Sequence, residues 1–260
     1  MTYEPKRIVV LNTSGNVGKT TIAIHLLSAF RPDAKYISVE NFNNSEARDV
    51  ESLLLEEIKA SDFRHIYRQL MLEDDVIVDV GASNVEKFME ELTKYQSAVK
   101  QFDMIVIPTV PDSKQQKDTI ETIEWLNKLG VPGNKIRVIF NQYPGAGATI
   151  RDTYPHIIGF SLDDGATQVS WLPHVIVEQN EIFEYVKSSR KTIRELQAET
   201  TDWAAALTEA KAAKDPVAME LAMDNRMTHD LADSAMPNLL KAYQDLFTPY
   251  AAPLQKATKK

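Results

Sequence analysis

The segment Ile8–Thr21 constrains the fold of this chain more than any other stretch of its sequence. A β-branched run leads into a tight turn that ends at Gly18–Thr21, and an apolar helical pattern follows through Phe30. Backbone N–H groups of such a turn, and of the helix that follows it, converge on one point and favour an anion there. Lys19 would reach the β- and γ-phosphates of a nucleotide, and the Thr20 hydroxyl would hold Mg²⁺. The alternative is a chance Gly-Lys-Thr in a surface loop.

The turn departs from the usual phosphate-binding loop, because Thr13 stands six residues before Lys19, where a glycine is usual. The turn resembles the KGGxGKT[ST] loop of the ParA/MinD family of P-loop ATPases. Ser14 replaces the family lysine, which reaches the partner's phosphates in an ATP-sandwiched dimer, and Asn16 replaces a family glycine. The resemblance implies a nucleotide-dependent homodimer, with hydrolysis that is slow or depends on a partner. The residues it assigns to the phosphates are Gly15, Asn16, Val17, Gly18, Lys19, Thr20 and Thr21.

Length and composition limit the remaining classes. A chain of 260 residues can form one large α/β domain with a helical appendage. The absence of cysteine excludes disulfides, thiolate catalysis and Cys-ligated metals, and the five histidines show no close metal-ligand spacing. A net charge of −8 encodes no bulk attraction to nucleic acid. No apolar run approaches the ~18 residues of a membrane span and no signal-peptide core is visible, so we expect a cytoplasmic protein.

Strand and helix patterns alternate through the first two thirds of the chain. The predicted strands are Arg7–Asn12, Lys35–Val39, Asp75–Val80, Met104–Pro108, Ile136–Asn141 and Thr167–Leu172. The predicted helices are Lys19–Phe30, Ser45–Lys59, Ser61–Leu72, Val85–Lys94 and Lys114–Leu129. This alternation predicts an α/β fold, with a mostly parallel P-loop sheet of the ParA/MinD type and helices on both faces. Ligands of such sheets bind at the carboxyl ends of the strands.

From Tyr185 the pattern becomes all-helical and predicts a helical C-terminal extension. Lys187–Lys214 is predicted as one long helix. Asp215–Phe247 is predicted as one or two more, with Pro216 at a helix start and a break at Pro237. The chain then divides into three predicted parts: a P-loop nucleotide-binding domain (1–188), a helical extension packed on it (189–247) and a flexible tail (248–260).

Two acidic residues follow predicted strands. Asp79, two residues before Gly81, resembles a Walker B acid that would hold Mg²⁺, with the Gly81 N–H facing the γ-phosphate. The alternative for Asp79 is an acid that caps a buried strand. Glu40 stands where the family carries D-x-D-P-Q, and it would orient the attacking water. A solvent-facing loop acid is an equally good interpretation of Glu40.

Two residues are candidates for the nucleoside end of the site. Asn141 ends a predicted strand, where the family places an asparagine against the adenine edge, and an amide both donates and accepts hydrogen bonds. A turn asparagine is the alternative. Pro173 anchors a weak comparison of Ser170–Tyr185 with the family's late strand, proline-containing loop and following helix, which flank the base and ribose.

Four basic residues, Lys187, Arg190, Lys191 and Arg194, fall at helical spacing near the start of the extension. ParA-like proteins hold DNA phosphates with such surfaces. Because acidic residues lie between and around them, a solvated charged face is the preferred interpretation. A membrane-binding C-terminal helix of the MinD type is not expected, since the tail lacks a broad apolar face.

The sequence therefore resembles a divergent ParA/MinD-type ATPase and, within that group, the StbB-type plasmid stability proteins. The resemblance implies ATP and Mg²⁺ as cofactors and a positioning switch in plasmid stability, partition or conjugative transfer. It also implies a plasmid-encoded DNA-binding partner protein, through which DNA is contacted indirectly. ATP is preferred over GTP because no guanine-specific motif follows Asn141. The alternatives are a non-hydrolysing nucleotide-binding scaffold and a small-molecule ligase similar to dethiobiotin synthetase.

Overall fold

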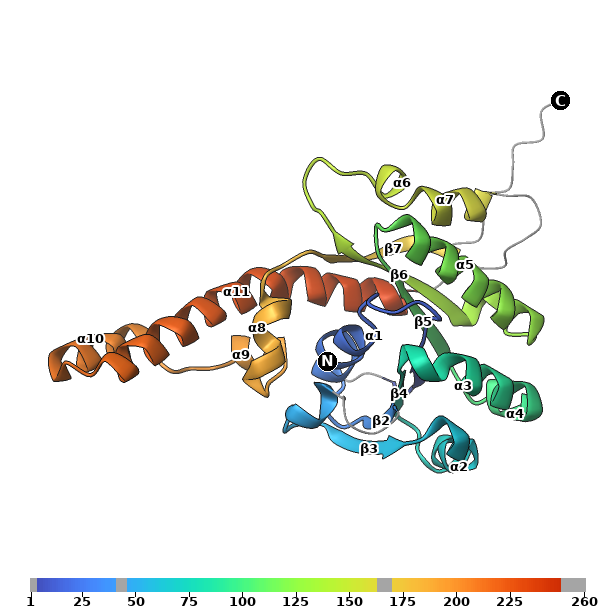
Figure 1. Cartoon of the computed structure of the whole chain (residues 1–260), viewed down its shortest axis with the longest axis horizontal. Coiled ribbons are helices and arrows are strands. Elements are labelled where there is room, and N and C mark those ends of the chain that lie inside the picture. Colours follow the sequence, from blue (N-terminus) through green and yellow to red (C-terminus); the bar gives the residue numbers. More distant parts are fainter. Residues whose placement is uncertain (1–3, 41–45, 163–169, 249–260) are drawn as a thin grey trace.

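A seven-stranded sheet forms the centre of the molecule (Figure 1). The computed structural model describes residues 4–40, 46–162 and 170–248. The strand order is β3-β2-β4-β1-β5-β6-β7, and every neighbouring pair runs parallel. The strands are β1 (Arg7–Val10), β2 (Lys35–Val39), β3 (Leu54–Ile58), β4 (Val76–Val80), β5 (Met104–Thr109), β6 (Ile136–Tyr143) and β7 (Ser170–Glu178). The predicted parallel α/β fold is confirmed.

Helices cover both faces of the sheet. The first follows β1 as one helical run of α1 (Lys19–Thr21), a π-helical stretch η1 (Ile22–Leu27) and a 3-10 turn η2 (Ser28–Phe30). The other α-helices are α2 (Phe63–Leu72), α3 (Ala82–Lys94), α4 (Gln96–Val99), α5 (Ser113–Lys128), α6 (Ile150–Thr153), α7 (Pro155–Leu162), α8 (Ile182–Ser189), α9 (Ile193–Gln197), α10 (Trp203–Ala213) and α11 (Pro216–Phe247). Short 3-10 turns are η3 (Glu46–Asp49), η4 (Ala60–Asp62) and η5 (Gly133–Lys135).

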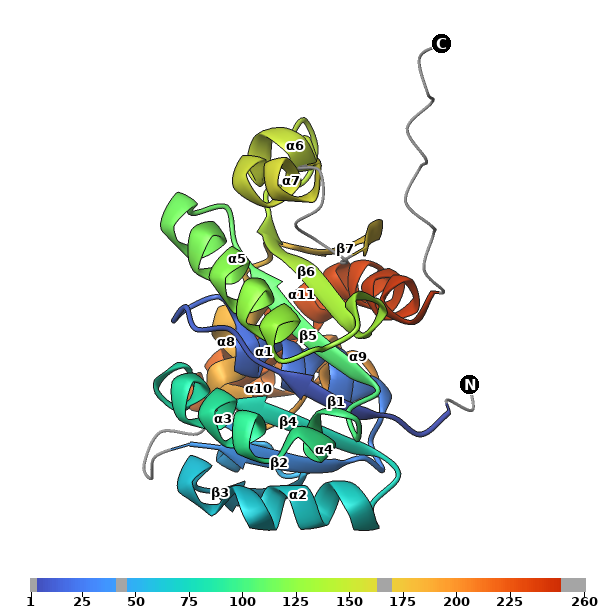
Figure 2. The ribbon, with the colours of Figure 1, turned by 90° about the vertical axis from the view of Figure 1, so that its right-hand side faces the viewer.

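The hydrophobic core has two layers, one on each face of the sheet. Along β1, Val9 points into one layer, and Ile8 and Val10 point into the other, as the period of two of a strand requires. Helices α2, α3, α5 and α7 cover the first face, and α2, α3 and α5 are visible along it in Figure 2. The α1–η2 run, α8, α9 and α11 cover the second face. Both faces of the central strands are therefore buried, as their near-continuous apolar sequences predict.

The C-terminal helices form a long extension of the second layer. The last half of α11 packs on β7, α8 and α9, and its first half pairs with α10 in a hairpin that projects from the body (Figure 1). None of the helices in the described ranges combines the length and apolar character that a bilayer crossing requires. The boundary at residue 188 stays a prediction, and residues 249–260 of the predicted tail lie outside the described part of the chain.

Two predictions about secondary structure near the site were wrong. Ser45–Lys59 was predicted as a helix, but its last part forms the edge strand β3, whose acidic residues pair across to Lys35 and Arg48. A short apolar run does not distinguish a helix from a strand by its period. The predicted strand Thr167–Leu172 is displaced to β7, and residues 167–169 lie outside the described ranges.

The helix boundaries of the extension also differ from prediction. Instead of one helix over 187–214, three helices form, because Arg190 adopts a left-handed φ of 57° after α8 and a Thr192–Glu195 capping box starts α9. Pro216 begins α11 as predicted, but Pro237 lies inside that helix instead of breaking it. Proline removes one backbone hydrogen bond from a helix and so favours a break there. The turns on either side of Pro237 pack on the sheet, and this packing outweighs the loss of that hydrogen bond.

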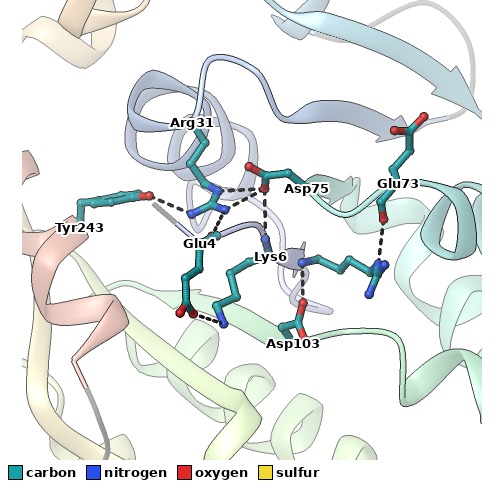
Figure 3. Close-up of polar contacts among 8 residues, drawn as sticks. Glu4, Lys6, Arg31, Glu73, Asp75, Asp103 and Tyr243 are labelled. Carbon is teal, nitrogen blue, oxygen red and sulfur yellow. Dashed lines mark hydrogen bonds and ion pairs between the residues drawn. The ribbon is translucent and has the colours of Figure 1, made fainter. Parts of the chain in front are cut away.

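A buried arginine joins several segments at the amino-terminal end of the strands (Figure 3). The Arg31 guanidinium donates to the Asp75 carboxylate at 2.9 and 3.0 Å, to the Tyr243 hydroxyl at 3.1 Å and to the Glu4 carbonyl at 2.6 Å. Its charged group also lies over the Phe247 ring. These contacts tie the end of the first helix to the starts of β1 and β4 and to the end of α11.

Candidate functional site

The loop between β1 and α1 has a backbone shape that its glycine permits. Gly18 has a φ of +85°, and Asn16 has a φ of 56°. A Cβ atom at Gly18 would overlap the side-chain amide of Asn141. The Gly18 carbonyl accepts from the Ile22 N–H at 2.9 Å and so starts the helix. A left-handed φ and a crowded neighbour both require glycine at this position.

Lys19 is buried at the centre of this loop. The residue is 7% exposed, and its Nζ donates to the Ser14 carbonyl at 2.6 Å. Burial lowers the pKa of Lys19 to about 8, while the charges of Asp79 and Glu40 act in the opposite direction. An ammonium group has three donors. A buried cation of this kind is suited to receive an anion.

Asp79 and Thr20 meet at the carboxyl ends of β4 and β1. Asp79 is 1% exposed, and its Oδ2 accepts from the Thr20 hydroxyl at 2.8 Å and from the Tyr36 hydroxyl at 2.9 Å. In the described ranges, no three His, Asp or Glu side chains cluster to hold a metal by themselves. Mg²⁺ is commonly held by one or two protein oxygens together with substrate phosphates, and the Thr20–Asp79 pair fits that role.

Glu40 and Gly81 lie against each other at the ends of β2 and β4. A Cβ atom at Gly81 would overlap the Glu40 carboxylate, so the glycine makes room for this side chain. The Gly81 N–H, which was expected to face a phosphate, donates to the Val39 carbonyl at 3.1 Å and extends the sheet. Residues 41–45, which follow Glu40 in the sequence, lie outside the described ranges.

Asn141 lies on the other side of the loop. Its Nδ2 donates to the Val17 carbonyl at 2.9 Å, and its own carbonyl accepts from the Tyr154 hydroxyl at 2.7 Å. The next residue, Gln142, has a left-handed φ of 57°. Pro173 lies inside the edge strand β7 instead of in a loop after it, and β7 has an irregular register where proline is tolerated.

The first half of the loop is fixed to helix α5 by a polar network that the sequence did not indicate. The Ser14 hydroxyl donates to Asp118 at 2.9 Å, and the Thr13 N–H and hydroxyl both contact the Thr122 hydroxyl. The Gln115 amide donates to the Gly15 carbonyl at 2.8 Å. The helical spacing of Asp118 and Thr122 is the signal that could have placed them on one face of α5.

A cavity of about 510 Å³ opens above these residues. It brings together predicted site residues from the loop, β2, β4 and β6 with residues of α8 that were not predicted. Its lining consists of Gly15, Asn16, Gly18, Lys19, Thr20, Thr21, Glu40, Gly81, Ala82, Asn141, Gln142, Phe183, Glu184 and Lys187. The volume lies in the range of small-molecule and cofactor sites.

The four basic residues near the start of the extension do not lie on one helix. Lys187 lines the cavity, whereas Lys191 pairs with Glu199 at 2.6 Å. Arg194 donates to the Ala29 carbonyl at 3.0 Å and lies over the Phe30 ring. The turn after α8 interrupts the predicted helix, so these side chains do not share one helical face, although those of Lys187, Arg190 and Lys191 are solvent-exposed.

One family model matches the part of the chain that contains the loop and the strands from β1 to β6. Residues 8–162 match the CbiA family, the CobQ/CobB/MinD/ParA nucleotide binding domain, and no curated protein matches significantly. Similar solved structures include McdA of Cyanothece bound to ATP (17% identity, 75% of this chain and 91% of that one, TM-score 0.48). MinD of Aquifex aeolicus is 16% identical, with 89% of this chain and 97% of that one covered and a TM-score of 0.48. A ParA family ATPase of Chlorobium tepidum is also 16% identical, with 85% of this chain and 97% of that one covered and a TM-score of 0.48. Because the family match spans more than half of the 260 residues, the chain belongs to the CobQ/CobB/MinD/ParA family of nucleotide-binding domains.

Proposed function

We propose that this protein binds ATP with Mg²⁺ in the cavity at the carboxyl ends of the strands and acts as a slowly hydrolysing positioning switch. The observation that carries the proposal is Lys19, a buried cation on the floor of a cavity beside the hydrogen-bonded Thr20–Asp79 pair. Such a cation stabilises little by itself, since burial opposes its charge. A bound anion would offset the cost of burying this charge.

The roles of the site residues follow from this proposal. The backbone of Gly15–Thr21 would hold the phosphates, with Lys19 reaching the β- and γ-groups. Thr20 and Asp79 would hold Mg²⁺, which when bound neutralises phosphate charge. Glu40, fixed against Gly81, would orient the attacking water. Asn141 would meet the base, and Pro173 would support that side of the site from β7.

The switch would operate through the loops after Glu40 and Asp79, the second of which leads directly into α3. Contacts of these loops with the γ-phosphate would order them, and hydrolysis would release them. The ordered state would bind a second copy of the chain or a DNA-binding partner in the cytoplasm. The more specific role in plasmid stability, partition or conjugative transfer rests on the resemblance to StbB-type proteins alone.

A second candidate function is a nucleotide-binding scaffold that does not hydrolyse ATP. The observation that favours it is the Ser14 hydroxyl, which donates to Asp118 and provides no charge for the phosphates. In that case ATP binding alone would set the conformation, and the switch would reset by nucleotide exchange.

ATP turnover by the purified chain separates these candidates. We would measure phosphate release with Mg²⁺, alone and with DNA or the partner encoded beside it, for the wild type, Lys19→Ala and Asp79→Asn. The positioning switch predicts slow turnover alone, stimulation by a partner and loss in both variants. ATP binding without turnover under every condition would establish the scaffold instead. Turnover that needs a small carboxylate or amine would indicate a ligase.

A further inference from the structure

Helix α8 forms one wall of the cavity, although it lies far from the phosphate-binding loop in sequence. Its buried residues, Ile182 and Val186, pack into the hydrophobic layer that also holds η1. Phe183, Glu184 and Lys187 line the cavity. The buried pair is spaced by four residues and fixes the rotation of the helix. That rotation directs the neighbouring stripe toward the nucleotide site.

Two lysines line the cavity, and they have different environments. Lys19 is buried and donates to the Ser14 carbonyl, as described above. Lys187 is 49% exposed, and its Nζ lies 2.8 Å from Oε2 of Glu184, which is 78% exposed. An ion pair between two exposed side chains contributes little free energy. A polyphosphate, with a higher charge density than one carboxylate, can therefore replace Glu184 at small cost.

The charges around the site create a need for this second cation. A nucleoside triphosphate carries several negative charges, and the carboxylates of Glu40 and Glu184 line the same cavity. Within the loop Asn12–Thr21, Lys19 is the single basic residue. Position 14 supplies a hydroxyl that is directed to Asp118 on α5. A lysine on a flexible four-carbon stem at the cavity wall is placed to supply the missing charge.

We propose that Lys187 leaves Glu184 when nucleotide binds and contacts its phosphate groups, so that α8 supplies a second phosphate-binding cation from the same chain. Glu184 competes with the nucleotide for Lys187 and lowers the affinity. This inference rests on the proposed function, because the ligand must carry a polyphosphate. It also joins the nucleotide site to the C-terminal helices, since α8 leads directly into α9.

Equilibrium binding of ATP, ADP and AMP to the full chain in Mg²⁺ tests this proposal through changes of opposite sign. We expect Lys187→Ala to weaken ATP binding about tenfold, the value of one charge-assisted hydrogen bond, and Lys187→Arg to restore most of it. Glu184→Gln should strengthen ATP binding about twofold to threefold, because it removes the competing half of a weak ion pair. AMP, with one phosphate, should be affected least.

Lys191→Ala is the matched control, because Lys191 lies four residues after Lys187, does not line the cavity and pairs with Glu199. It should bind ATP like the wild type. Wild-type affinity in Lys187→Ala, with binding abolished in Lys19→Ala, would overturn the role of Lys187 and leave the proposed function intact. Failure of the wild type itself to bind ATP would overturn both. A tighter-binding Glu184→Gln cannot result from misfolding.

Discussion

Each end of the sheet contains a buried basic side chain, and the two side chains differ in how many hydrogen-bond partners the chain provides for them. At the amino-terminal end, Arg31 is 4% exposed and finds its partners within the chain, in Asp75, Tyr243 and the Glu4 carbonyl. At the carboxyl end, Lys19 is equally buried but donates to one loop carbonyl, that of Ser14, and faces a cavity. A cation satisfied by the chain stabilises the fold, whereas a cation left facing a cavity can bind a ligand.

The largest effect on stability should come from breaking the Arg31 network. Arg31→Met leaves the Asp75 carboxylate without its guanidinium partner, so we expect a loss of about 3 kcal/mol in the free energy of unfolding by urea. Arg7→Met at the same end is the control. Arg7 donates to the Glu73 carbonyl and pairs with the exposed Asp74, and we expect about 1 kcal/mol. Equal losses in the two variants would show that Arg31 has no special role. ATP affinity should not change in either folded variant.

Gly18→Ala should distort the loop between β1 and α1, at the carboxyl end of the sheet. The new methyl group meets the Asn141 amide, and a φ of +85° adds backbone strain. We expect a loss of about 2–3 kcal/mol in stability and no detectable ATP binding. Gly130→Ala is matched in backbone, with a φ of +76°, but its Cβ would enter open space. It should cost only about 1 kcal/mol and leave ATP binding intact. Equal effects would refute the crowding at Gly18.

Lys19→Met should raise the stability of the fold in the absence of nucleotide, whereas Arg31→Met should lower it. Because the pKa of Lys19 is about 8 in the folded chain against 10.5 when unfolded, the unfolded state binds more protons between these values. Stability should therefore rise with pH across this window, and the full cost of the buried charge is present below pH 8. We expect Lys19→Met to raise the Tm by about 2–4 °C at pH 7 and the difference to disappear above pH 10.5. A lower Tm at pH 7 would contradict this.

Tyr36→Phe should produce the smallest change. It removes one of the two hydroxyl groups that donate to Asp79 Oδ2 and leaves Thr20 in place. We expect a loss of about 1 kcal/mol in stability and a higher Mg²⁺ requirement for ATP binding. Tyr67→Phe, whose exposed hydroxyl donates to Ser97, is the control and should change neither quantity. An unchanged Mg²⁺ requirement in Tyr36→Phe would separate Tyr36 from the metal site.

Local patterns predicted the fold well where one segment determines its own structure. The predicted strand at Met104–Pro108 is fully apolar, and its burial on both faces follows directly. The edge strand Leu54–Ile58 was missed because its pairing with β2, not its own sequence, decides its conformation. The long predicted helix over 187–214 failed for a related reason, since the capping box at Thr192 begins a new direction of the chain.

The site also contains some residues that local sequence patterns predicted and others that they did not. The proximity of Lys19, Thr20 and Asp79 follows from a loop motif and a strand end, and the sheet topology brings them together as the motif requires. The partners Tyr36, Asp118 and Lys187 come from distant segments, so their approach to the site appears only in three dimensions. Lys187, which lines the cavity, was interpreted from the sequence as part of a solvated charged face.

Calorimetric titration of ATP into the wild-type chain in Mg²⁺, with Lys19→Ala as the reference, tests the nucleotide site most directly. We expect saturable binding at one site per chain, and loss of that binding in a variant that remains folded by circular dichroism. Equal heats for the two proteins, or no binding by the wild type, would contradict the assignment of the cavity and its buried lysine to a nucleotide.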